Sequence, residues 1–147
     1  MKPTAAHQNN TLKASSILLI LLWSSTGLSK ILEFAEFKQQ LTTILGEDMA
    51  KPVSVAIPSL ELTAAMTIPF GKTRTFGLYL SLILMATFTA YVILVITGYF
   101  GPAPCTCGGI ITALSWKQHL IVNLTLLLIV VYSLFTLRKR KGAAVTP

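Results

Sequence analysis

The sequence predicts an all-α fold, a bundle of four transmembrane helices with a short amphipathic helix at the membrane surface between the first and second. Hydrophobic residues make up 53% of the 147 residues and charged residues only 12%, whereas soluble domains are about 25% charged. The chain also contains four mostly apolar stretches of about 20 residues, the length that a helix needs to cross a bilayer. Only polar connections separate them, so we treat 1–147 as a single membrane domain in a lipid bilayer.

Each of the first two predicted spans carries a charged side chain. The first covers about 14–32 and has Lys30 near its end. A cleaved secretory signal is the alternative for this segment, but its apolar pattern continues past the small residues that would form the cleavage site, which favours a retained helix. The second span, about 52–70, is the weakest of the four because Pro58 and Glu61 interrupt it.

The third and fourth predicted spans are more clearly apolar. The third covers about 75–99 and contains no charged residue, and a tight turn at 71–74 joins it to the second span. The fourth covers about 116–137 and contains Asn123. A run of four basic residues stops it and begins a tail, 138–147, that we expect in the cytoplasm.

The connection between the first two spans is itself predicted to be helical. In its sequence, EFAEFKQQLTTILGED, the charges lie on the side opposite an apolar stripe. The stripe consists of Phe34, Phe37, Leu41 and Ile44. A helix with such a stripe next to a membrane span is typical of one that lies in the membrane interface.

The distribution of cations predicts the orientation. Lys and Arg gather in the cytoplasmic connections of membrane proteins. Eight of the 12 Lys and Arg residues lie at the two ends of the chain and in the 71–74 turn, and four lie on the other side together with four acidic residues. We therefore expect both termini in the cytoplasm, and the net charge of +7 reflects this topology and attraction to anionic lipid rather than nucleic-acid binding.

The two cysteines of the chain lie in the connection after the third span, in the sequence PCTCGG. This connection is then periplasmic, where disulfides persist. A bridge between Cys105 and Cys107 would close a very small strained ring, and strained, exposed disulfides are the readily reduced ones. We favour a pair that exchanges disulfides; a structural bridge, or two thiols that complete a metal site with a partner, are the alternatives.

Glu61 is the one acidic residue inside a predicted span. A carboxylate there costs on the order of 3 kcal/mol unless it is paired, protonated or facing water. Lys30, at the outer end of the first span, can pair with it or extend to the interface. Two interpretations stay open: a partner for a proton or for a quinone hydroxyl within the bundle, and a contact that only packs two helices together.

His119 and Asn123 are one helical turn apart near the outer end of the fourth span, below the cysteines. The histidine can bind a quinone carbonyl or give a proton to a departing thiolate. The plainer interpretation, which we favour, is that it forms a hydrogen bond in the headgroup zone.

Taken in order, these features resemble the MauE branch of the MauE/DoxX family. The resemblance rests on GLSKILEFAEF, PSLEL, the charge-free third span and PCTCGG. It matches Cys105 and Cys107 to the cysteine pair of the family and Glu61 to its second-span carboxylate. It also matches Lys30 and Asn123 to the polar residues of the first and fourth spans.

The resemblance implies a four-helix redox-associated protein of the inner membrane, linked to methylamine utilisation. It implies a thioredoxin-like or secreted disulfide-bearing partner and, through the DoxX relatives, a quinone as cofactor. The function we expect is thiol–disulfide exchange through the cysteine pair. The alternatives are a non-catalytic anchor or assembly subunit with a structural disulfide, and, less well supported, a small transporter that uses Glu61 as its proton site.

Overall fold

The computed structural model describes residues 5–99 and 115–143, and the side chains of residues 10–99 and 115–139. The cysteines at 105 and 107 therefore lie outside the described residues. Within those ranges the chain is helical, as the sequence predicts. The five helices are α1 (Ala5–Leu32), α2 (Phe34–Leu45), α3 (Glu47–Thr67), α4 (Arg74–Ile96) and α5 (Trp116–Ala143).

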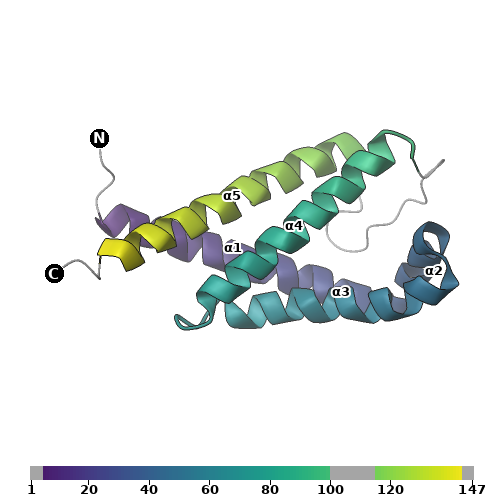
Figure 1. Cartoon of the computed structure of the whole chain (residues 1–147), viewed down its shortest axis with the longest axis horizontal. Coiled ribbons are helices and arrows are strands. Elements are labelled where there is room, and N and C mark those ends of the chain that lie inside the picture. Colours follow the sequence, from purple (N-terminus) through teal and green to yellow (C-terminus); the bar gives the residue numbers. More distant parts are fainter. Residues whose placement is uncertain (1–4, 100–114, 144–147) are drawn as a thin grey trace.

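The four long helices run side by side, each antiparallel to the next along the chain, and α2 lies across one end (Figure 1). The closest packing is between α4 and α5, between α1 and α3, and between α2 and α3. The start of α1 and the end of α5 lie at the same end of the bundle (Figure 1). At that end the Arg138 guanidinium donates a hydrogen bond to the Tyr79 hydroxyl, which joins the end of α5 to the start of α4.

Three helices are long and apolar enough to cross a membrane: Asn10–Leu32, Arg74–Ile96 and Trp116–Lys139. They correspond to the first, third and fourth predicted spans, with ends that differ by a few residues. The second predicted span corresponds to α3, which is not among these candidates, so the four-span bundle stays a prediction. α5 also continues past 137 through the basic run to Ala143, where the sequence predicts only a tail.

The core lies at the centre of the bundle around Trp23, whose side chain is only 1% exposed. It is packed by apolar residues of four helices, among them Leu19, Ala64, Leu78, Met85, Leu126 and Val130. Large apolar side chains also cover the outside of the helices, for example Leu21, Met66 and Leu128, each more than 60% exposed. A surface of this kind suits lipid rather than water as its solvent.

The turn between α3 and α4 is closed by hydrogen bonds from α4 to the end of α3. Thr73 Oγ1 donates to the Thr67 carbonyl (2.9 Å) and Arg74 Nε to the Ile68 carbonyl (3.1 Å), so carbonyls that the helix end leaves free find donors. Gly77 lets α4 approach closely, because a Cβ there would stand 2.6 Å from Thr67 Oγ1. The tight turn predicted at 71–74 thus falls between the two helices and just reaches into α4.

Candidate functional site

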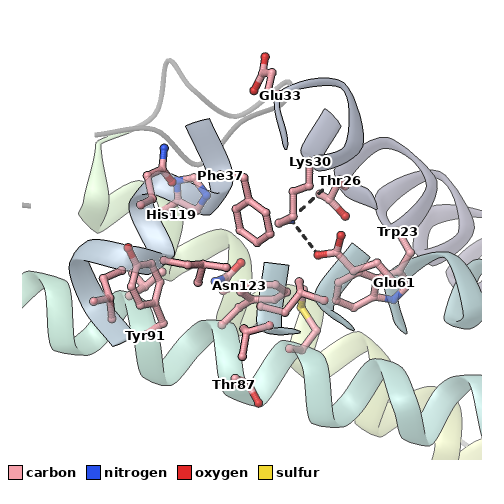
Figure 2. A pocket seen from close by; sticks show the side chains of 18 of the residues that line it. Trp23, Thr26, Lys30, Glu33, Phe37, Glu61, Thr87, Tyr91, His119 and Asn123 are labelled. Carbon is pink, nitrogen blue, oxygen red and sulfur yellow. Dashed lines mark hydrogen bonds and ion pairs between the residues drawn. The ribbon is translucent and has the colours of Figure 1, made fainter. Parts of the chain in front are cut away.

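All five helices contribute side chains to one cavity of about 310 Å³. The cavity lies toward the end of the bundle where α1 ends, α3 and α5 begin, and α2 crosses (Figures 1 and 2). Most of its wall is apolar, with aromatic rings from Trp23, Phe37, Phe88 and Tyr91. The polar side chains predicted from the sequence to matter all line it: Lys30, Glu61, His119 and Asn123.

An ion pair joins α1 to α3 at the wall of this cavity. Lys30 Nζ lies 2.8 Å from Glu61 Oε1 and 3.5 Å from the Thr26 carbonyl (Figure 2). Glu61 is fully buried, and the Lys30 side chain is 14% exposed. Gly27 has no side chain, and this lets the two helices come close here. A Cβ on Gly27 would stand 3.1 Å from the Leu62 side chain and 3.4 Å from the Glu61 Cβ. Of the two interpretations of Lys30, pairing is the one the structure contains.

The second carboxylate oxygen of Glu61 has no hydrogen-bond partner among the described residues. Thr26 lies beside it, but the Thr26 hydroxyl donates to the Leu22 carbonyl (3.0 Å). A buried acceptor without a donor is unfavourable by about 1–3 kcal/mol, and by more when it is charged. The carboxylate is therefore held on one side only.

Aromatic rings surround the ammonium group of Lys30. Its Nζ lies 5.2 Å from the centre of the Phe88 ring on α4 and 5.7 Å from that of Phe37 on α2, within the range of cation–π attraction. Below them, Trp23 Nε1 donates to Ser81 Oγ at 2.8 Å, and Ser81 in turn donates to the Gly77 carbonyl. These contacts fix the floor of the cavity, and the Trp23 and Ser81 donors are both satisfied.

His119 and Asn123 line the cavity from α5 (Figure 2). Asn123 is 7% exposed, and its side-chain amide makes no hydrogen bond to another described residue. His119 has a ring contact with Trp116, at 6.2 Å between ring centres, and likewise no hydrogen bond from its side chain within the described ranges. The cavity therefore offers two further polar groups that a bound molecule can use.

α2 is the helix predicted between the first two spans, and its apolar stripe faces the bundle. Phe37, Leu41 and Ile44 of that stripe line the cavity, while Phe34 is 39% exposed. The stripe therefore covers the site instead of facing only lipid. Whether α2 also lies in the membrane interface stays a prediction.

Comparison with known families identifies the chain. A family model described as methylamine utilisation protein MauE matches residues 8–136. The chain belongs to the MauE family. No curated protein and no solved structure matches it. The MauE match covers every residue of the cavity, and membership together with the three apolar helices makes the chain a multi-pass membrane protein.

The cysteine pair of this MauE-family chain belongs to the connection 100–114, outside the described residues. The described residues on either side do fix where that connection attaches. α4 ends at Ile96, about one turn beyond Tyr91 and Val92 of the cavity. α5 begins at Trp116, three residues before His119. In the described ranges no three His, Cys, Asp or Glu side chains gather as a metal site would require.

Sequence reasoning misses the aromatic residues of the cavity. Phe88 and Tyr91 belong to α4, which is apolar on all sides, so no periodicity marks the face that they share. Phe37 is recognised only as part of an apolar stripe. The one available signal is the buried cation itself, because an ammonium in an apolar bundle needs π faces or anions around it.

Proposed function

We propose that this MauE-family chain is a four-span inner-membrane protein that oxidises a partner protein in the periplasm. In this proposal Cys105 and Cys107 exchange a disulfide with a secreted or thioredoxin-like partner, and a quinone in the membrane takes up the electrons. The description of the family adds that the pathway served is methylamine utilisation.

One observation carries the proposal. Four polar residues from three helices, α1, α3 and α5, gather at a single apolar-walled cavity, at the end of the bundle where the cysteine-bearing connection leaves α4 and returns to α5. A convergent set of polar groups in an apolar pocket is the usual form of a small-molecule site. Its place next to that connection supports electron transfer between the cysteines and a membrane-soluble molecule.

The fourth span of the proposal is α3. It runs antiparallel to α1 and α4 and packs against both, so it covers the same depth of the bundle. Its charges at Glu47, Asp48 and Lys51 all lie in the first turns, where an interface would be. Its one deeper charge, Glu61, is paired with Lys30, which removes the main cost of placing it in a bilayer.

The chemistry balances without any further component. A thiolate of the partner attacks the Cys105–Cys107 disulfide, forming a mixed disulfide, and the second partner thiol resolves it, so the partner is oxidised and the cysteine pair becomes a dithiol. The dithiol then gives two electrons and two protons to the quinone, which becomes a quinol, and the disulfide forms again.

The test follows the oxidation state of the partner in cells. Cys105→Ser and Cys107→Ser, alone and together, are expected to leave the partner reduced, because each change removes the disulfide that the partner thiolate attacks. With the unchanged chain, a partner that keeps only its attacking cysteine is expected to stay bound as a mixed disulfide, because it lacks the thiol that resolves it. A Ser59→Ala variant, changed on an exposed face of α3, is the matched control. Full partner oxidation in the double cysteine variant would contradict the proposal and favour a non-catalytic anchor subunit.

The topology has its own test. Cysteine-reactive labels that do not cross the membrane are expected to reach a cysteine placed at Ser115 from the periplasm and one placed at Lys72 only after the cells are opened. The background for both is the double Cys-to-Ser variant. Labelling of both positions from the same side would contradict the proposal, because they flank the single span α4. Labelling of the Lys72 position from the periplasm would contradict the proposed orientation.

A further inference from the structure

Two carboxylates at the rim of the cavity have no counter-charge among the described residues. Glu33 and Glu36, at the junction of α1 and α2, line the cavity, are exposed, and form no ion pair with another described residue. Lys30 is the one Lys or Arg in the described lining, and it is already paired with Glu61. The lining thus holds three carboxylates and one ammonium, and an excess of negative charge in a cleft attracts a cation.

Asn123 adds a different requirement in the interior of the same cavity. Its side chain is 7% exposed and makes no hydrogen bond to another described residue. Figure 2 shows Asn123 in the middle of the lining side chains and Glu33 at their outer edge. Buried polar groups are nearly always hydrogen-bonded, and a side-chain amide both donates and accepts. A peptide group, which also does both, is the ligand chemistry that satisfies it.

The rest of the wall decides between two sources of a cation. Aromatic rings, among them Phe88 and Tyr91, accept a large apolar group. A phospholipid with an amine headgroup brings a cation and apolar chains, but beyond the headgroup it has only ester acceptors and no N–H for Asn123. An extended peptide brings a basic side chain, an apolar side chain and the backbone amides between them.

We propose that the cavity docks an extended segment of the partner protein. An apolar side chain of the segment lies among the aromatic rings, a neighbouring backbone amide bonds to Asn123, and a basic side chain lies beside Glu33 and Glu36. The inference rests on the proposed function, in which the partner is oxidised by cysteines of the connection that attaches beside this cavity. It adds what is recognised: the cysteine pair requires only a thiol, whereas the cavity selects a basic and apolar sequence.

Peptides without cysteine test the docking apart from the disulfide chemistry. The probe is a capped tripeptide with benzoylphenylalanine between two lysines, photo-crosslinked to the unchanged full chain in dodecylmaltoside micelles. Mass spectrometry then identifies the residues that carry the crosslink. We expect them in the lining, for example at Leu41, Val53 and Ile57. We expect none at Met66, which is 69% exposed on the outside of α3 and does not line the cavity.

Competition with uncrosslinked peptides separates the three contributions. The capped peptide with phenylalanine between two lysines should displace the probe at a concentration about 10-fold or more below the one with two glutamates, because like charges repel at the rim. Replacing the phenylalanine by alanine should weaken displacement about 10-fold or more, because less apolar surface is buried. Methylating the backbone nitrogens should weaken it about 5-fold, because a hydrogen bond to Asn123 is lost.

Matched variants assign these effects to residues. Glu33→Gln/Glu36→Gln should bring the lysine and glutamate peptides within about 3-fold of each other, because the rim is then neutral. Glu47→Gln/Asp48→Asn makes the same change at exposed positions outside the lining and should keep the full difference. Asn123→Leu should remove the effect of methylation and keep the charge preference.

Three results with the unchanged chain would overturn the inference. They are crosslinks at Met66 as abundant as in the lining, equal displacement by the lysine and glutamate peptides, and displacement by phosphatidylethanolamine at the concentration at which the lysine peptide acts. The last would assign the cavity to a lipid. All three decide the question even where Asn123→Leu fails to fold. Since no peptide carries a thiol, loss of partner oxidation in the cysteine variants and loss of peptide preference are separate results.

Discussion

Breaking the Lys30–Glu61 pair from its two ends is expected to have unequal effects. Lys30→Met leaves a carboxylate that is fully buried with no other charged partner in reach among the described residues. Removing one partner of a buried pair typically destabilises by about 3–5 kcal/mol. The carboxylate can instead take up a proton, and with a reference pKa of about 4.3 this costs about 3.7 kcal/mol at pH 7, from about 2.7 pH units at 1.36 kcal/mol each.

We therefore expect Lys30→Met to lower the free energy of unfolding by about 3–4 kcal/mol at pH 7. The folded variant then holds a proton that the unfolded chain releases, so its free energy of unfolding rises as the pH falls, and the loss at pH 5.5 should be about 2 kcal/mol smaller. Glu61→Met should cost less, because the Lys30 ammonium keeps two aromatic rings and is partly exposed. The double variant should lie within about 1 kcal/mol of the unchanged protein, because two methionines fill the same volume without charge.

The assay is titration with sodium dodecyl sulfate of protein held in dodecylmaltoside micelles, followed by Trp23 fluorescence and by circular dichroism. Glu47→Met/Lys51→Met is the control and should shift the free energy by less than about 0.5 kcal/mol. A double variant as unstable as Lys30→Met would refute the reasoning, since the loss would then come from packing. So would a loss in Lys30→Met that does not change with pH.

Two further predictions concern the packing that holds the cavity in place. Ser81→Ala removes the acceptor of the buried Trp23 indole N–H and should lower the free energy of unfolding by about 1–3 kcal/mol in the same titration. Ser59→Ala, at an exposed hydroxyl, should change it little. Equal effects of the two variants would contradict a stabilising role for the Trp23–Ser81 hydrogen bond. Gly77→Ala places a Cβ 2.6 Å from Thr67 Oγ1 and 3.0 Å from the Ile68 backbone nitrogen, and it should lower the free energy of unfolding by about 1–3 kcal/mol. Gly71→Ala, whose Cβ meets nothing within 4 Å, is the control. A Gly77→Ala protein as stable as the unchanged chain would show that α3 and α4 can separate freely.

The ion pair was within reach of sequence reasoning, and the cavity was not. A carboxylate inside an apolar stretch demands a partner, and Lys30 is the one cation near the outer end of the neighbouring stretch, so the sequence offers the pair as one of two interpretations of Lys30. Bringing His119 and Asn123 to the same place depends on how α5 is rotated about its axis. α5 is apolar on nearly every side, so its sequence carries little information on that rotation.

The same limit applies to α2. Its stripe of Phe37, Leu41 and Ile44 says that one side is apolar, but a stripe of this kind fits a bundle and a membrane surface equally well. The structure turns the stripe toward the cavity because α3 follows after only Gly46, whose positive φ of 80° reverses the chain and lays α2 along the start of α3. The direction of the stripe thus comes from a turn and not from the pattern itself.

The double variant separates what the pair does for the fold from what it does for the cavity. A buried ion pair is weak support for stability, because apolar residues of similar volume often serve as well. If the Lys30→Met/Glu61→Met protein is as stable as the unchanged chain, then the fold has no need of the charges. The reason for a carboxylate inside α3 then lies in what the cavity does, and Lys30 keeps the pair neutral within an apolar bundle.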